Sequence, residues 1–170
     1  TVDIYVEMTS NSTCLGANPA VVQSTNETIT INTIPSITNA TLTETVCEGT
    51  GSTGLVITAD VVGTNFAWAS TPSAGITGNT ASGAGDLPSD TYANAGVAAG
   101  TVTYTITPSS NGCPGTPVDY VVTINPLPTV TNVLLTETVC AGTASAGAIL
   151  TSDVAGVTFG WTSAVTGSIT

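Results

Sequence analysis

An internal repeat with a period of 93 residues sets the size of the folding unit in this chain. The segment Leu42–Cys47 (LTETVC) recurs unchanged as Leu135–Cys140. At the same offset of 93, residues 41–70 and 134–163 are identical at 17 of 30 positions. Self-similarity at a fixed period is typical of proteins that are built from successive copies of one folding unit.

The repeat divides the chain into three parts. The segment that ends at Cys14 corresponds to the segment that ends at Cys113, so the preceding unit is also represented. We predict that residues 1–35 are the C-terminal part of one unit, 36–128 a complete unit and 129–170 the N-terminal half of the next. The chain begins within a strand pattern and without a signal peptide, so we expect it to be an internal fragment of a longer protein.

Alternating polar and apolar residues predict β-strands within the complete unit. In Val102–Thr107 and Val118–Ile124, every second residue is a large apolar or aromatic one, so these residues should face a core. Asn111-Gly112 lies between the two segments and favours a hairpin turn. The remaining predicted strands are Leu42–Val46, Gly54–Ala59, Asn65–Ser70 and short segments near Ile76 and at Thr91–Ala93.

About seven short strands in each repeat match an immunoglobulin-like β-sandwich, which typically has about 100 residues. The predicted fold class is therefore all-β, with tandem immunoglobulin-like sandwiches. Trp68 and Phe66 are the predicted core anchors of the complete unit. Trp161 and Phe159 hold the same positions one period later.

The absence of basic residues excludes several functions. The chain has no Lys, Arg or His and 11 acidic residues, for a net charge of −11. A nucleic-acid-binding protein needs cations to displace phosphate counterions. An anionic membrane surface would repel the chain, and no apolar run is long enough to insert into a bilayer. Without His or Lys, the usual nucleophile–base pairs and Schiff bases are missing, so we predict that the chain is not an enzyme.

Five motifs of the complete unit resemble a known family, the PKD-like repeats. These repeats occur in long cell-surface proteins of Bacteroidetes, such as gliding-motility adhesins exported by the type IX system. The resemblance covers the whole chain and implies tandem immunoglobulin-like sandwiches with no catalytic residue. The motifs are Thr45–Gly49 (TVCEG), Gly63–Trp68 (GxxFxW), Gly100–Pro108 (GTVTYTITP), Asn111–Cys113 (NGC) and Val122–Pro128 (VTINPLP).

The four cysteines, Cys14, Cys47, Cys113 and Cys140, favour an oxidising compartment. Cys47 and Cys113 belong to one unit and are candidates for a disulfide within it. In a simple sandwich, however, they would lie at opposite ends, too far apart for a bridge. A disulfide between successive units is the alternative, and both pairings stay open.

Acidic and amide side chains provide two further sets of candidate sites. Asp86 and Asp90, in a Gly-rich loop, and Asp60, at a predicted turn, have the oxygen ligands that Ca²⁺ prefers. They lack the spacing of a known calcium loop, so solvated carboxylates are the preferred interpretation and no cofactor is predicted. Three Asn-x-Ser/Thr sequons are candidate glycosylation sites: Asn11, Asn26 and Asn39.

The junctions between units carry proline. Ile124–Pro128 (INPLP) corresponds to Ile31–Pro35 (INTIP), and the two prolines of the first segment favour a semi-rigid, extended link. We therefore expect a structural spacer at the cell surface, in the extracellular space, whose partners are the neighbouring repeats. One alternative is an adhesive module that binds glycans or surfaces through exposed aromatic residues, with Tyr92 and Tyr5 as candidates. The other is a self-assembling filament subunit, whose partners are copies of itself.

Overall fold

The structure is a computed structural model that describes residues 2–3, 28–29 and 31–166. All regular elements in these residues are β-strands, and the described part of the chain contains no helix, in agreement with the predicted all-β class. The strands are β1 (Val2–Asp3), β2 (Thr28–Ile29), β3 (Thr43–Cys47), β4 (Asn65–Pro72), β5 (Ile76–Thr77), β6 (Ser82–Ala84), β7 (Ala93–Asn94), β8 (Gly100–Ser110), β9 (Cys113–Pro114) and β10 (Val118–Asn125).

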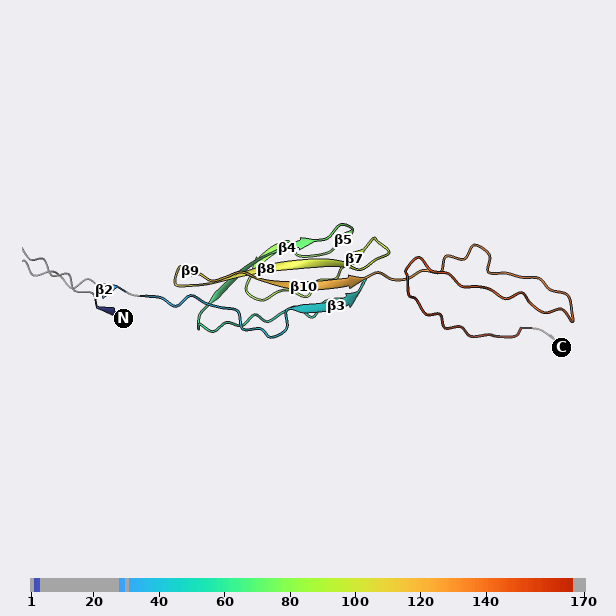
Figure 1. The fold of residues 1–170 in the computed structure, drawn as a ribbon, viewed down its shortest axis with the longest axis horizontal. Coiled ribbons are helices and arrows are strands. Elements are labelled where there is room, and N and C mark those ends of the chain that lie inside the picture. The colour runs from blue at the N-terminus through green and yellow to red at the C-terminus, as the bar shows by residue number, and fades with distance from the viewer. Residues whose placement is uncertain (1, 4–27, 30, 167–170) are drawn as a thin grey trace, which may run out of the picture.

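Six of these strands form one sheet, which makes the first layer of the fold (Figure 1). Its order is β3-β10-β8-β4-β6, and β9 pairs with the end of β8. β3 and β10 run parallel, with Asn125 opposite Cys47, whereas the other pairs are antiparallel. β1 and β2 form a separate antiparallel pair near the N-terminus.

The second layer has little regular strand structure. It contains the short antiparallel pair β5–β7 and three isolated bridges. These bridges join Ile37 to Ala59, Gly51 to Thr91 and Leu55 to Leu87. The fold is therefore a β-sandwich with one continuous sheet and one layer that consists mostly of loops.

The hydrophobic core lies between the two layers. The predicted alternation of β8 and β10 is confirmed, because the even-numbered residues from Val102 to Ile106 and from Tyr120 to Ile124 are buried. The second layer adds Ile57, Ile76, Leu87 and Tyr92. Among the described residues, the buried core residues lie between positions 57 and 124, and partly buried residues from Ile37 onward pack against them. The complete unit thus has a core of its own, as an independently folding domain requires.

The predicted strand Gly54–Ala59 is wrong, apart from the bridges at Leu55 and Ala59. Side chains take the place of a neighbouring strand at three of its backbone groups, while Leu55 and Thr58 also bond to the backbone of Leu87 and Thr38. The Asn39 amide donates to the carbonyl of Val56 (2.8 Å) and accepts from the N–H of Thr58 (2.9 Å). Asp86 accepts from the N–H of Ile57 (2.9 Å). Backbone groups that are satisfied in this way cannot form a regular ladder.

Two other details of the sheet were not predicted. β8 continues through Pro108 to Ser110, and the Asn111-Gly112 turn joins it to the short strand β9. Both turn residues have positive φ angles, 49° and 79°, as the predicted hairpin turn requires. β6 is the second addition. A side chain at its Gly83 would collide with the ring of Trp68, so the small residue is needed here.

Residues 129–166 repeat part of this structure. Their described part contains no strand and one isolated bridge, between Val130 and Ser152. Bonds of the complete unit nevertheless recur 93 positions later: Asn132 donates to Ile149 O and accepts from Thr151 N, as Asn39 does with Val56 and Thr58. The predicted boundaries of the three units stay a prediction.

Candidate functional site at the two ends of the sandwich

One end of the sandwich receives the preceding chain, and we call it the proximal end. It consists of residues 31–36 and the β8–β9 hairpin. The side-chain amide of Asn32 donates to the carbonyl of Asn111 in the hairpin turn (3.4 Å). Pro35 is fully buried, and a side chain at Gly115 would collide with its carbonyl. The last proline of the link is thus fixed within the sandwich.

A carboxylate holds the residue that follows this proline. The N–H of Ser36 donates to Asp60 Oδ1 (2.7 Å), and the N–H of Asp60 donates to the carbonyl of Ser36 (3.1 Å). Two reciprocal bonds restrict the direction in which the chain enters the fold. Asp60 therefore orients the link.

The opposite, distal end consists of the C-terminal ends of β3 and β10 and the loop between β7 and β8. Asn94 is buried, and its amide donates to the carbonyls of Ala98 and Ile124 (both 2.9 Å). The N–H of Glu48 donates to the carbonyl of Asn125 (2.8 Å), and the Glu48 carboxylate accepts from the N–H of Leu127 (3.4 Å). The chain therefore leaves through a defined set of contacts. Figure 1 shows that it arrives at one end and leaves at the other.

The segment that follows lies against the distal end. An open groove of about 410 Å³ is lined by the loop 97–99, the link residues Asn125 and Pro126, and the turn residues Val154 and Ala155. Apart from Asn125, the lining side chains are small or apolar, and they come from both sides of the link. The distal end therefore presents a surface on which the following segment rests.

The next segment repeats the attachment of the link. Thr129 occupies the position of Ser36, and its N–H and hydroxyl donate to Asp153 (2.8 and 2.6 Å). These bonds, the side-chain one foremost, lower the pKa of the Asp153 carboxyl. Bonds from Ala146 N–H and the Ser145 hydroxyl likewise lower the pKa of Glu137. The aspartate at this repeat position, Asp60 or Asp153, thus orients the chain after each link.

A polar cluster joins the two layers, and we call it the buried polar cluster: Asp90, Tyr92, Tyr104 and Ser52 are buried, and the exposed Thr80 bonds to them. The Asp90 carboxylate accepts bonds from the Tyr104 hydroxyl (2.7 Å), the Thr80 N–H (2.7 Å) and the Thr80 hydroxyl (2.8 Å). The hydroxyls of Tyr92 and Tyr104 are 3.0 Å apart, and that of Tyr92 lies 3.4 Å from the Ser52 hydroxyl. Neutral donors satisfy this carboxylate in a chain that has no basic side chain. The arrangement is typical of a structural lock.

We expect the stability of the sandwich to fall in alkaline solution. Burial, aided by bonds to Tyr92 and Asp90, raises the pKa of Tyr104, and burial with a bond to Glu44 raises the pKa of Tyr120. Because unfolded tyrosine ionises near pH 10, the stabilisation is complete below that pH and is lost above it. Above about pH 10, the free energy of unfolding should fall by about 1.4 kcal/mol per pH unit for each of the two tyrosines.

Urea unfolding between about pH 8 and 11.5 measures this slope. The Tyr120→Phe variant is the control, because it should retain the contribution of Tyr104 and show about half of the slope. A free energy of unfolding that stays level across this range would contradict the burial of the two hydroxyls.

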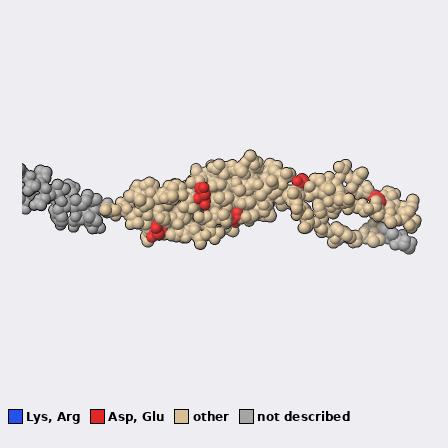
Figure 2. Space-filling view, viewed as in Figure 1, with Lys and Arg blue, Asp and Glu red and all other residues tan. Residues whose placement is uncertain are grey.

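The three calcium candidates lie apart in the structure. Asp86 bonds to the backbone of Ile57, Asp90 belongs to the buried polar cluster and Asp60 orients the link. On the face shown in Figure 2, the acidic groups are scattered singly. Within residues 2–3, 28–29 and 31–166, no group of three or more acidic, Cys or His residues could hold a metal ion.

The cysteines also lie apart. Cys47 is exposed at the distal end, and Cys113 is half-buried in β9 at the proximal end. Both are free thiols, as is the exposed Cys140, and Cys14 lies outside the described residues. The pairing of Cys47 with Cys113 within one unit is wrong for this structure, because β8 separates the two ends. The alternative pairing, between successive units, remains a prediction.

The candidate surface residues have different outcomes. Asn39 uses its side-chain amide to hold Val56, so a glycan on that nitrogen would remove a bond that shapes the second layer. Tyr92 is 1% exposed, and its prediction as an exposed ligand-binding aromatic is wrong, because its hydroxyl belongs to the buried polar cluster. Asn11, Asn26 and Tyr5 lie outside the described residues.

The predicted core anchors are buried or half-buried in the complete unit and exposed in the following segment. Trp68 is 6% exposed and meets the ring of Tyr104 edge-on at 5.7 Å, and Phe66 packs against the core. Trp161 is 79% exposed and Phe159 is 37% exposed. These two side chains are therefore not part of the described core.

Several residues that shape the sandwich and its distal end were missed by sequence reasoning. Glu44 accepts bonds from the Tyr120 hydroxyl (2.8 Å) and the N–H of Thr53 (2.9 Å), and Asn94 organises the distal loop. The recurrence of Glu44 as Glu137 is a signal that could have identified it. Asn94 has no equivalent within these 170 residues, so the sequence carries no such signal for it.

Comparisons with known proteins give one family. The model of a family described as PKD-like domain matches residues 44–128. No curated protein and no solved structure gives a match. None of the described residues forms a helix that could span a membrane.

Proposed function

This chain belongs to the PKD-like domain family, and from that premise we propose that it is a structural spacer segment of a secreted cell-surface stalk, fibre or adhesin. Modules of this family are typically extracellular, structural or adhesive, and non-catalytic. The proposal specifies the mechanical role: each unit adds length, and the links keep successive units in line.

The observation that carries the proposal is the position of the two links. Pro35 is fixed at the proximal end, whereas Asn125 and Leu127 are held at the distal end. The strands β8 and β10 run between these ends, so the length of the sheet separates the links. An array with this geometry extends in proportion to the number of its units.

Charge supports the same role. All of the ionisable side chains that carry charge at neutral pH are acidic, so successive units repel one another. Repulsion favours an extended array over a collapsed one. The adhesive alternative has less support, because Tyr92, one of its two candidate aromatic residues, is buried.

Small-angle X-ray scattering tests the spacer function. The sample is residues 31–128 followed directly by a second copy of residues 36–128, which preserves the link. We expect the maximum dimension to approach twice that of residues 31–128 alone. A compact pair, with the two units folded back on one another, would contradict the proposal.

A further inference from the structure

The two cysteines of the complete unit lie at opposite ends of the sandwich, each at the junction with a different neighbouring unit. Cys47 pairs in register with Asn125, the residue at which β10 ends and the link begins. Cys113 pairs with Ser110 in the β8–β9 hairpin at the proximal end. Each unit therefore carries one thiol at the end that it presents to the next unit and one at the end that it presents to the preceding unit.

A disulfide within one unit does not fit this geometry. Gly100, at the distal end of β8, is ten residues from Ser110, a separation of about 33 Å along an extended strand. A disulfide needs Cα atoms within about 7 Å of one another. The two thiols of one sandwich thus need partners elsewhere.

The junction before the complete unit indicates where the partner lies. Asn32 is the repeat equivalent of Asn125, so the preceding unit's equivalent of Cys47 would lie beside Asn32 on the neighbouring strand. The Asn32 side chain also contacts the carbonyl of Asn111, two residues before Cys113. One asparagine thus connects the positions of both thiols.

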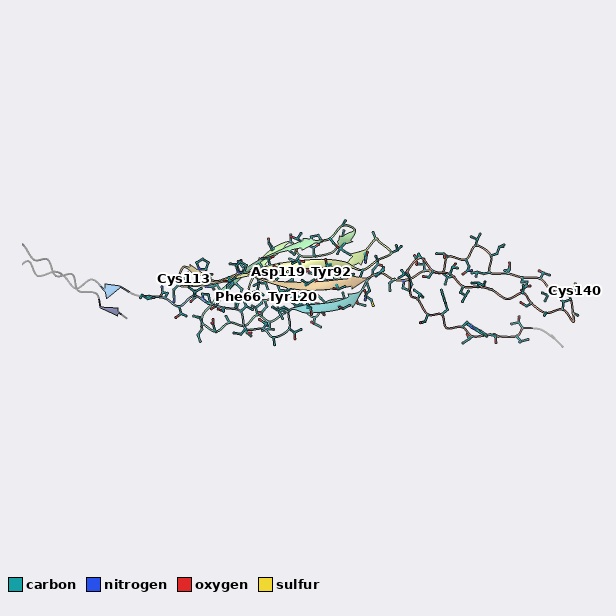
Figure 3. All side chains as sticks on the ribbon, viewed as in Figure 1. Phe66, Tyr92, Cys113, Asp119, Tyr120 and Cys140 are labelled. Carbon is teal, nitrogen blue, oxygen red and sulfur yellow. The ribbon has the colours of Figure 1, made fainter. Side chains whose placement is uncertain are left out.

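Figure 3 shows where two of these cysteines lie along the molecule. Cys113 lies at the proximal end of the sandwich, and Cys140, the repeat equivalent of Cys47, lies at the far end of the following segment. Cys47 and Cys140 are exposed and Cys113 is half-buried, so an oxidant can reach these thiols.

We propose that successive units are joined by a disulfide between Cys47 of one unit and the cysteine at the position of Cys113 in the next. The two thiols lose two protons and two electrons as the S–S bond forms. A disulfide oxidant accepts them and is reduced to two thiols. The bond adds a covalent connection beside each link and so limits bending at the junction.

Peptide mapping of a two-unit chain tests the pairing. Residues 31–128, followed by a second copy of residues 36–128, are refolded with oxidised glutathione and digested without reduction. Cleavage after glutamate and after aromatic residues releases Cys47 in the peptide 45–48 and Cys113 in the peptide 105–120. We expect one linked pair of these peptides per chain and two free thiols.

Matched single-copy variants identify which thiols are joined. Cys47→Ser in the first copy should abolish the linked peptide, whereas Cys47→Ser in the second copy should leave it unchanged. If the linked peptide were still found in each of the two single-copy variants, the cysteines would be paired within units, and the proposal would be overturned. A wild-type two-unit chain with four free thiols, or with bridges only between chains, would overturn it as well.

The proposal rests on the end-to-end arrangement of the proposed function, and the two can fail separately. An extended two-unit chain that forms no linked peptide would overturn the disulfide alone. A compact chain in scattering would overturn the spacer function, whatever the state of its thiols.

Discussion

Trp68→Ala is expected to lower the free energy of unfolding by about 3–5 kcal/mol, the usual cost of truncating a large buried aromatic residue. The indole is 6% exposed, meets Tyr104 edge-on and lies over Gly83 of β6. Its removal would leave a cavity at β4, between β8 and the edge strand β6. Urea unfolding of the 170-residue chain, followed by circular dichroism, measures the loss.

The repeat provides a matched control for this substitution. Trp161 holds the same position one period later but is 79% exposed, so Trp161→Ala should change the free energy of unfolding by less than about 0.5 kcal/mol. Trp68→Phe should cost less than the alanine variant, because the buried Trp68 Nε1 has no hydrogen-bond partner in the described residues. Equal losses at the two tryptophans would contradict the assignment of the core to the complete unit.

Asp90→Ala is expected to cost about 2–3 kcal/mol, because the buried Asp90 carboxylate accepts one hydrogen bond from the buried Tyr104 hydroxyl and two from the exposed Thr80. The substitution leaves the Thr80 N–H and hydroxyl without their partner. The Tyr104 hydroxyl retains only its contact with Tyr92. Since these groups come from both layers, their loss should also loosen the packing between the layers.

Asp119→Ala is the control for Asp90. Asp119 lies on the exposed face of β10 and accepts one bond, from the Thr105 hydroxyl (2.6 Å). Its loss should change the free energy of unfolding by no more than about 0.5 kcal/mol. If the two alanine variants were equally stable in urea, the buried polar cluster would not be the lock that we describe.

Most of the first layer could be predicted from the sequence. In β8 and β10, threonine alternates with apolar residues over a long run, and this pattern has no competing interpretation as a helix. The Asn111-Gly112 turn was equally clear, because both of its residues adopt positive φ angles readily.

The second layer was harder to predict, because side chains determine its backbone pairing. Gly54–Ala59 has the composition of a strand, but Asn39 and Asp86, each at least 15 residues away in sequence, take three of its backbone hydrogen bonds. The burial of Asp90 and Tyr92 was missed for a similar reason. Their loop looks polar and Gly-rich, and the donors that allow it to enter the core come from distant positions.

The two ends of the sandwich were predicted in outline. The prolines of the link indicated an extended junction, and the positions of Cys47 and Cys113 indicated opposite ends. The residues that hold the link, such as Asp60 and Glu48, came from the structure, since a single carboxylate in a sequence does not reveal which backbone groups it accepts from.

The growth of the molecule with unit number tests the spacer account most directly. One to four units are joined through the native link and their maximum dimensions are measured by small-angle scattering. Eleven residues of β8 and three link residues give an expected increase of about 45 Å per unit. As a control, replacing Pro126 and Pro128 by glycine should make this increase smaller. A maximum dimension that rises only with the cube root of the mass would contradict the account.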